Sequence, residues 1–153
     1  GDWQAMYDEL QQFRKACGDA HMKTILATGE LGSLKQVYQA SLVSMMAGSD
    51  FIKTSTGKEP TNATLDVSLV MIRALRDYLD RFGYKVGFKP AGGISSAKQA
   101  LAWQSLMKEE LGDDWLKNDL FRFGASSLLT DIERQLYHYL TGHYAAKHHM
   151  PMG

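Results

Sequence analysis

Residues 50–60 read DFIKTSTGKEP, and residues 86–93 read VGFKPAGG. Each stretch opens with a short apolar run of the kind that forms a buried strand, and each run ends in a lysine, Lys53 or Lys89. A polar loop with glycine follows each lysine, and a longer segment with an apolar stripe of helical period follows each loop. The two stretches therefore predict two successive βα units with a lysine at the end of each strand.

The same pattern extends in both directions along the chain. Residues 22–27 and 120–124 are suited to two further strands, each followed by a helical pattern, and residues 2–17 to an opening amphipathic helix. Strand ends near residues 27, 53, 89 and 123 are 26, 36 and 34 residues apart. This spacing is typical of parallel strands joined by right-handed crossovers, so we predict one helix followed by four βα units.

Polar residues mark where two of the helices begin. Thr61 or Asn62 is expected to cap the helix that ends near Phe82, and Ser95 or Ser96 the helix that ends near Leu111.

The α/β pattern fits two architectures, a small open doubly wound sheet or half of an eight-unit TIM (β/α)8 barrel. A full barrel takes ~250 residues, so four units correspond to about half of one. The opening helix has no strand before it, which favours a chain cut from a larger barrel. We expect a single domain over residues 1–153, with residues 144–153 as a loosely ordered tail.

Composition and charge exclude several classes of partner. Lys and Arg number 17, as do Asp and Glu, so the net charge gives no reason to expect a nucleic acid or an anionic membrane as partner. No apolar run approaches the ~20 residues of a membrane span, and no signal peptide is recognisable. The single Cys17 suits a reducing compartment, so we expect a cytoplasmic protein. The histidines at 138, 143, 148 and 149 lack a metal-ligand pattern, and no cofactor or metal is expected.

Two lysines at strand ends suggest amine chemistry. An amine attacks a carbonyl only when it is unprotonated, and a free lysine with a pKa of ~10.4 is neutral in only about one molecule in 2,500 at pH 7. A second ammonium nearby, together with partial burial, lowers the pKa of the first. Lys53 and Lys89 therefore make sense as a nucleophile and its electrostatic activator, although strand-end lysines also simply reach solvent. Gly87 lies on the face of Lys89 and is expected to leave room beside the lysine stem.

The loops after the last strands supply a candidate anion site. Residues 91–93 with the serines that follow, and residues 124–127, offer uncrowded backbone N–H groups near helix starts. In (βα)8 barrels the loops after the last two strands frequently bind phosphate. The same residues also occur in ordinary tight turns.

Four segments carry a resemblance to a known family. FIKTSTGK (51–58) and GFKPAGG (87–93) resemble the two lysine strands of the deoxyribose-phosphate aldolases, which are class I aldolases, and TGEL (28–31) and FGASS (123–127) are similar to further family segments in the right order. The resemblance covers nearly the whole chain, and the extended ending is more similar to animal members.

This resemblance implies a (βα)8 barrel of which the chain holds the last four units. It implies reversible cleavage of 2-deoxy-D-ribose 5-phosphate to acetaldehyde and D-glyceraldehyde 3-phosphate, a step of deoxyribonucleotide catabolism, without metal. Lys53 would form the Schiff base, and Lys89 would lower its pKa and transfer protons, with Lys23 in support. The substrate phosphate would be held by Gly57, Lys58, Gly92, Gly93, Ser126 and Ser127.

The chain also departs from the family pattern. The family's proton relay uses an aspartate on a strand of the first barrel half, and no such segment occurs here. We therefore expect this chain alone to be inactive and to self-associate or pair with the missing N-terminal half, because a half-barrel exposes sheet edges and an apolar interior. Two alternatives remain open: another class I aldolase acting on a different phosphosugar, and a non-catalytic phosphate-binding α/β module.

Overall fold

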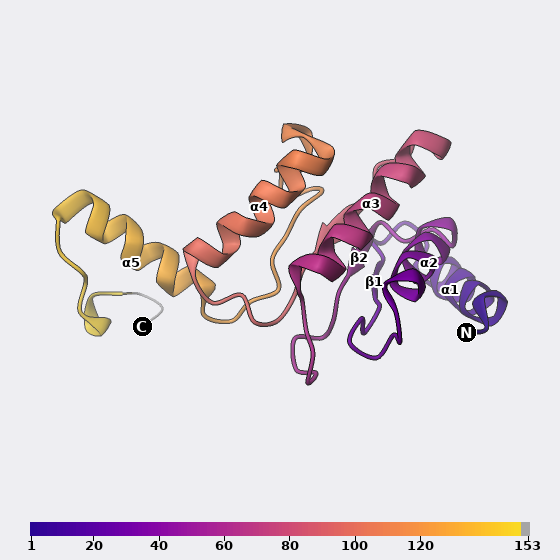
Figure 1. The fold of residues 1–153 in the computed structure, drawn as a ribbon, viewed down its shortest axis with the longest axis horizontal. Helices are drawn as coiled ribbons and strands as arrows, with labels where there is room; N and C mark the ends of the chain where they lie inside the picture. Colours follow the sequence, from indigo (N-terminus) through magenta and orange to yellow (C-terminus); the bar gives the residue numbers. More distant parts are fainter. Residues whose placement is uncertain (151–153) are drawn as a thin grey trace.

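The structure is a computed structural model and describes residues 1–150, apart from the side chain of Lys147. Pro151 to Gly153, the end of the expected tail, lie outside the described residues. Helices and strands alternate as predicted, with two short 3-10 turns that were not foreseen, and the helices follow one another in space from one end of the molecule to the other (Figure 1). The elements are α1 (Trp3–Cys17), β1 (Lys23–Ile25), α2 (Leu34–Met46), β2 (Phe51–Lys53), α3 (Leu65–Phe82), β3 (Gly87–Lys89), α4 (Ala97–Leu111), η1 (Asp113–Trp115), α5 (Leu128–Thr141) and η2 (Lys147–His149).

Three strands form a parallel sheet in the order β1-β2-β3, which confirms the predicted parallel pairing. The expected fourth strand at 120–124 is not continuous. It pairs with β3 and the following residues through two isolated parallel bridges, Phe88 with Phe121 and Ala91 with Gly124. Arg122 N–H donates to the carbonyl of Phe88 at 3.1 Å, and Gly124 N–H to that of Pro90 at 2.8 Å. The ladder is interrupted between them because Pro90 has no N–H to donate.

The helix caps refine two predictions. Ser96 is the cap of α4: its hydroxyl accepts from Gln99 N–H, and the two residues form a capping box. The expectation that Thr61 or Asn62 caps α3 was wrong, because Thr64 holds that position. Asn62 is engaged elsewhere, since its side-chain amide donates to the Glu59 carbonyl at 2.7 Å and its oxygen accepts from Ser55 Oγ at 2.9 Å.

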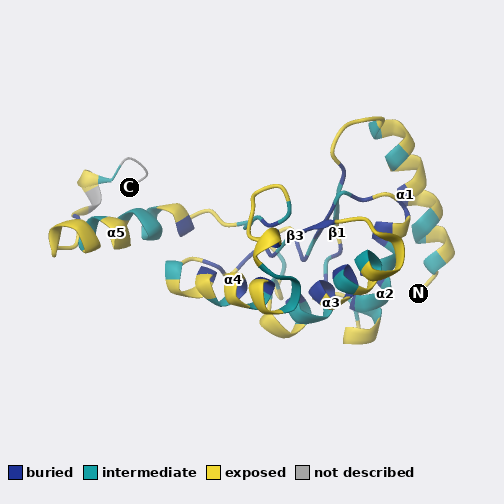
Figure 2. Ribbon diagram, turned by 90° about the horizontal axis from the view of Figure 1, so that it is seen from above, coloured by how far each residue is buried: buried dark blue, intermediate teal, exposed yellow. Residues whose placement is uncertain are grey.

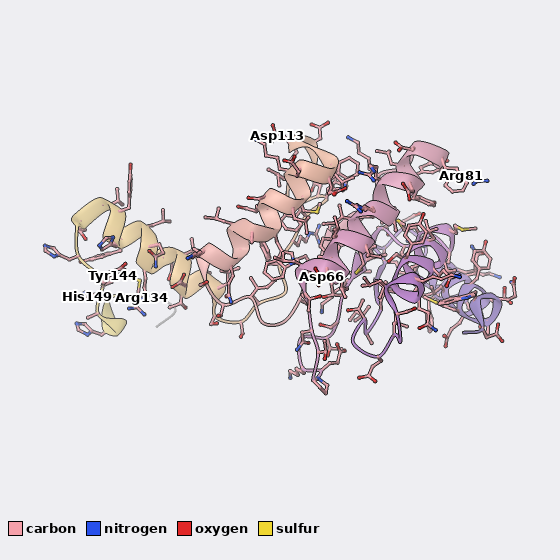
Figure 3. All side chains as sticks on the ribbon, in the orientation of Figure 1. Asp66, Arg81, Asp113, Arg134, Tyr144 and His149 are labelled. Carbon is pink, nitrogen blue, oxygen red and sulfur yellow. The ribbon has the colours of Figure 1, made fainter. Side chains whose placement is uncertain are left out.

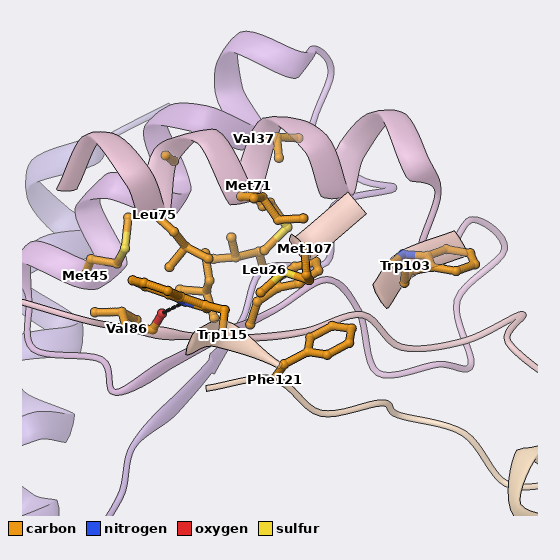
Figure 4. Close-up of a cluster of buried hydrophobic side chains, with 14 of the residues drawn as sticks. Leu26, Val37, Met45, Met71, Leu75, Val86, Trp103, Met107, Trp115 and Phe121 are labelled. Carbon is orange, nitrogen blue, oxygen red and sulfur yellow. Dashed lines mark hydrogen bonds between the residues drawn. The ribbon is translucent and has the colours of Figure 1, made fainter. Parts of the chain in front are cut away.

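The apolar core lies between one face of the sheet and helices α2, α3 and α4 (Figure 4). Ile52 of β2 and Phe88 of β3 project into it, and both are fully buried. Trp115 of η1 closes one end of the core and donates from its indole nitrogen to the Val86 carbonyl at 3.4 Å. Buried residues concentrate on the inner sides of these helices, whereas α1 and α5 are mostly exposed (Figure 2).

The opposite face of the sheet points away from this core. Because side chains alternate along a strand, Phe51, Lys53 and Lys89 lie on this face while Ile52 and Phe88 face the core. Ile25, which is 44% exposed, shares it. The chain is thus an α/β protein with a partial parallel sheet. Among residues 1–150, no helix combines the length and the apolar character that crossing a membrane requires.

Candidate active site

The two predicted lysines lie side by side. Lys53 of β2 and Lys89 of β3 are register partners on adjacent parallel strands, and both are half-buried. Paired positions on neighbouring strands point to the same face, so the two amines share one environment. Lys23 lies on the same face at the start of β1, because it is two residues before Ile25, the register partner of Lys53. We refer to Lys23, Lys53 and Lys89 as the lysine cluster.

A fourth cation, Arg122, adjoins the cluster and was missed by the sequence reasoning. Its guanidinium carbon lies 4.6 Å from the centroid of the Phe51 ring, and the Nζ of Lys23 lies 5.8 Å from the same centroid. The alternation of side chains along the predicted strand 120–124 could have pointed to Arg122. Arg122 stands between Phe121 and Phe123 in the sequence, so its side chain faces away from theirs. Phe121 pairs with the core residue Phe88, which places Arg122 on the face opposite the core.

Burial and repulsion between positive charges lower the pKa of two members of the cluster, Lys89 and Lys23. Burial lowers the pKa of Lys89, and the positive charges of Lys23, Lys53 and Arg122 lower it further. Burial likewise lowers the pKa of Lys23, with added repulsion from Arg122 and Lys53. A lowered pKa increases the fraction of neutral amine at a given pH, which is the form that accepts a proton or attacks a carbonyl.

The ring of Phe51 forms the floor beneath this cluster. Phe51 is fully buried although it faces away from the core, and its ring lies over Gly87 of the neighbouring strand. A Cβ at Gly87 would stand well inside van der Waals contact of three ring carbons. Gly87 was expected to leave room beside the stem of Lys89, and the structure corrects this: the ring of Phe51 fills that room.

A cavity of about 390 Å³ lies beyond the ends of β2 and β3. Three loops line it: the one after Lys53, the one after Lys89, and residues 124–127. Gly57, Gly92 and Gly93 all have positive φ angles, between 79° and 91°, a region that glycine adopts at little cost. All six residues predicted to hold phosphate line this cavity, and so do Ser95, Gly124 and Ala125 of the predicted anion loops. Thr56 and Ile94 complete the lining and were not predicted.

Buried hydroxyls join the first two loops. Thr54 and Ser55 are fully buried. Thr54 Oγ1 accepts from the backbone N–H of Ala91 at 3.0 Å, while the single O–H of Ser55 is shared between the Ala91 carbonyl at 2.8 Å and Asn62 Oδ1 at 2.9 Å. The residues that follow Lys53 are therefore fixed to the loop that follows Lys89.

The cavity and the lysine cluster are in direct contact. Gly124 lines the cavity, and a Cβ placed there would come within 3.4 Å of Cε of Lys89 and 2.6 Å of the Ala91 Cβ. The absence of a side chain at Gly124 therefore lets the stem of Lys89 pass next to the loop. An anionic group bound in the cavity would therefore lie next to a carbonyl group bound at the lysine cluster.

Comparison with known proteins agrees with this arrangement. Residues 1–133 match the sequence profile described as DeoC/LacD family aldolase. The chain belongs to the DeoC/LacD family of aldolases. It is 72% identical over 152 residues to a deoxyribose-phosphate aldolase of Mus musculus and 69% identical to that of Homo sapiens. Each alignment covers 99% of this chain and 48% of the relative, so the chain spans about half the length of the curated relatives it matches.

Solved structures of aldolases share the fold. "QR15, an Aldolase" superimposes with a TM-score of 0.67 at 27% identity, covering 90% of this chain and 53% of that one. The tetrameric deoxyribose phosphate aldolase of Aeropyrum pernix gives a TM-score of 0.64 over 92% of this chain and 51% of its own. At 22% identity, this second likeness concerns the fold alone.

Proposed function

We propose that this DeoC/LacD family chain carries the Schiff-base half of a deoxyribose-phosphate aldolase. The observation that carries the proposal is the register pairing of Lys53 with Lys89 beside a glycine-lined cavity. The identity of about 70% to mammalian deoxyribose-phosphate aldolases supports the substrate, 2-deoxy-D-ribose 5-phosphate, and the products, acetaldehyde and D-glyceraldehyde 3-phosphate.

Lys53 is the proposed nucleophile. Its neutral amine adds to the aldehyde carbon of the open-chain sugar, and loss of water leaves an iminium ion on Nζ. The C2–C3 bond then breaks as the C3 hydroxyl gives up its proton, with the bonding electrons drawn toward the iminium nitrogen. Glyceraldehyde 3-phosphate leaves, the remaining enamine takes up a proton at carbon, and water frees acetaldehyde and the amine. Lys89 is the neighbouring group whose lowered pKa suits it to proton exchange in these steps.

The cavity is the proposed phosphate site. Loops with glycines in the left-handed region and the start of α4 present backbone N–H groups that favour anions. Lys58, Ser126 and Ser127 add a positive charge and two hydroxyls. A phosphate held there would place the other end of the sugar toward Lys53, because the loops begin where β2 and β3 end.

The chain is proposed to form the last four units of a (βα)8 barrel. β1 is an edge strand of the sheet in the described residues, and a hollow of about 440 Å³ beside it is lined by apolar side chains that include Leu10, Phe13 and Ile25. An unpaired edge with an apolar flank favours pairing with a missing first half or with a second copy. We therefore expect low activity from the chain alone. The free thiol of Cys17 is compatible with a cytoplasmic protein.

Borohydride trapping tests the function. The chain, alone and mixed with the first half of the mouse relative, is incubated with acetaldehyde or deoxyribose phosphate, reduced, and digested for peptide mass analysis. We expect an adduct at Lys53, and its loss in Lys53→Arg, because a guanidinium stays protonated. Lys85→Arg, at an exposed lysine, is the matched control and should keep the adduct. An adduct at another lysine in the mixture, or none, would refute the assignment.

The same material separates the alternatives. A different class I aldolase would form the Lys53 adduct but cleave another phosphosugar faster than deoxyribose phosphate in a substrate panel. A non-catalytic phosphate-binding module would bind phosphate equally well before and after Lys53→Arg and would form no adduct.

A further inference from the structure

Arg122 is held more firmly than a surface arginine. Its planar guanidinium lies against the ring of Phe51, and its Nε donates to the Asn118 carbonyl at 2.6 Å. A stacked and hydrogen-bonded guanidinium loses little additional freedom, so its charge occupies a defined place.

The guanidinium charge of Arg122 lies among the amines of the lysine cluster. Arg122 and Lys23 both contact the ring of Phe51, and the ring belongs to the strand that ends in Lys53. In the part of the chain that the structure describes, no carboxylate forms an ion pair with Arg122 or with any lysine of the cluster. Four basic groups therefore share one face without a compensating acid on these elements.

Arginine and lysine differ in how they respond to such crowding. A lysine relieves the repulsion by releasing its proton, whereas a guanidinium remains charged at any pH a protein tolerates. When both are present, the lysines change protonation state and the arginine does not.

We propose that Arg122 is a positioning residue that fixes a permanent positive charge beside Lys23 and Lys89, so that these amines give up their protons more readily. The catalytic consequence rests on the proposed function: a readily deprotonated Lys89 exchanges protons with substrate bound to Lys53. The repulsion from Arg122 that contributes to the lowered pKa of both lysines agrees with this role.

The groups that face Lys89 come from every neighbouring element. They are Lys23 from β1, Lys53 from β2 and Arg122 from residues 120–124. His21, just before β1, lies on the same aromatic ring, with its ring centroid 5.2 Å from that of Phe51. Arg122 is the one guanidinium of this set, and the other members are amines and an imidazole.

Competitive acylation of the lysines tests the inference without an activity assay. The chain and its Arg122→Gln variant are labelled with limiting acetic anhydride against a reference amine over a range of pH, and each lysine is read from its peptide mass. We expect the labelling rate of Lys89 at neutral pH to fall about 3–10-fold in Arg122→Gln, from the loss of one nearby charge partly screened by water. Arg122→Lys, which restores a positive charge, should recover part of the rate.

Arg81→Gln is the matched control, because Arg81 also lies over a phenylalanine ring, that of Phe82 at 5.8 Å, but at the far end of α3 (Figure 3). It should leave Lys89 labelling unchanged. If Arg122→Gln does not fold, Arg122→Met, which keeps an apolar contact with Phe51, carries the same comparison. An unchanged Lys89 titration in the neutral variants would overturn the inference.

The mixture with the first half of the mouse relative gives the catalytic readout. There the pH profile of turnover should move to higher pH in Arg122→Gln and return toward the parent in Arg122→Lys. An unmoved profile would overturn the proton-exchange role. Failure of the proposed function would look different: it removes the Lys53 adduct in the parent protein and leaves the labelling difference at Lys89 intact.

Discussion

The ring of Phe51 occupies the space in which a side chain at Gly87 would stand. Gly87 lies on the neighbouring strand, 36 residues further along the chain. This contact contributes to the complete burial of Phe51 on the face opposite the core, where the ring gives Lys23 and Arg122 an aromatic surface to lie on. The geometry of the lysine cluster therefore depends on a residue that has no side chain.

Gly87→Ala should destabilise the chain by about 1–3 kcal/mol, because the added methyl group displaces the Phe51 ring. Gly32→Ala is the control: Gly32 is exposed, and its Cβ would meet the flexible end of Gln36. We expect less than about 0.5 kcal/mol there. Urea unfolding measures both, and equal losses would mean that the ring moves aside at no cost.

Thr54→Val should destabilise the chain, whereas Thr28→Val should not. Thr54→Val leaves the buried N–H of Ala91 without its acceptor and should cost about 1–3 kcal/mol. The hydroxyl of Thr28 is also buried but has no hydrogen-bond partner among the described residues, so replacing it with a methyl group should be neutral or stabilise by up to about 1 kcal/mol. Thermal unfolding of the two variants tests this. A loss in Thr28→Val as large as that in Thr54→Val would count against it.

Gly92→Ala and Gly93→Ala separate backbone strain from steric overlap in the phosphate loop. Both glycines have positive φ, which costs alanine about 1–2 kcal/mol. At Gly93 the new Cβ meets nothing within 4 Å, whereas at Gly92 it would lie 2.5 Å from Asn62, so we expect about 2–4 kcal/mol for Gly92→Ala.

The same pair tests phosphate binding. In Gly93→Ala the methyl group stands in the open cavity and should reduce the rise in melting temperature that inorganic phosphate gives the parent chain. An undiminished rise would place the bound phosphate elsewhere.

The stability of the chain should rise with pH in the alkaline range through Lys89. Its pKa is lowered in the fold from the ordinary 10.5, so between the lowered value and 10.5 the unfolded chain binds more protons than the folded one. The free energy of unfolding therefore increases with pH across that window. Below the window the Lys89 amine is charged in both states, and its charge destabilises the folded chain to the full extent. Lys89→Gln should reduce this increase, to which Lys23 with its lowered pKa also contributes, while Lys98→Gln, at an exposed lysine, should keep it in full. Urea unfolding at a series of pH values gives the comparison, and parallel curves for the parent and Lys89→Gln would contradict it.

The sequence by itself determined the order of the elements, the parallel pairing of the three strands, the two lysines at strand ends and the glycine loops beyond them. These features follow from local periods of two and 3.6 residues and from the turn preferences of glycine, which are readable without the fold. The start of α3 was misplaced because Asn62 had a partner, Ser55, that local pattern does not reveal.

Only the tertiary structure decided which residues meet. The register that pairs Lys53 with Lys89, the ring of Phe51 over Gly87, the guanidinium of Arg122 beside the lysines and the break in the fourth strand opposite Pro90 join segments more than 30 residues apart. Such contacts depend on how the helices pack the strands together, and this packing is set by the whole core and not by any one segment.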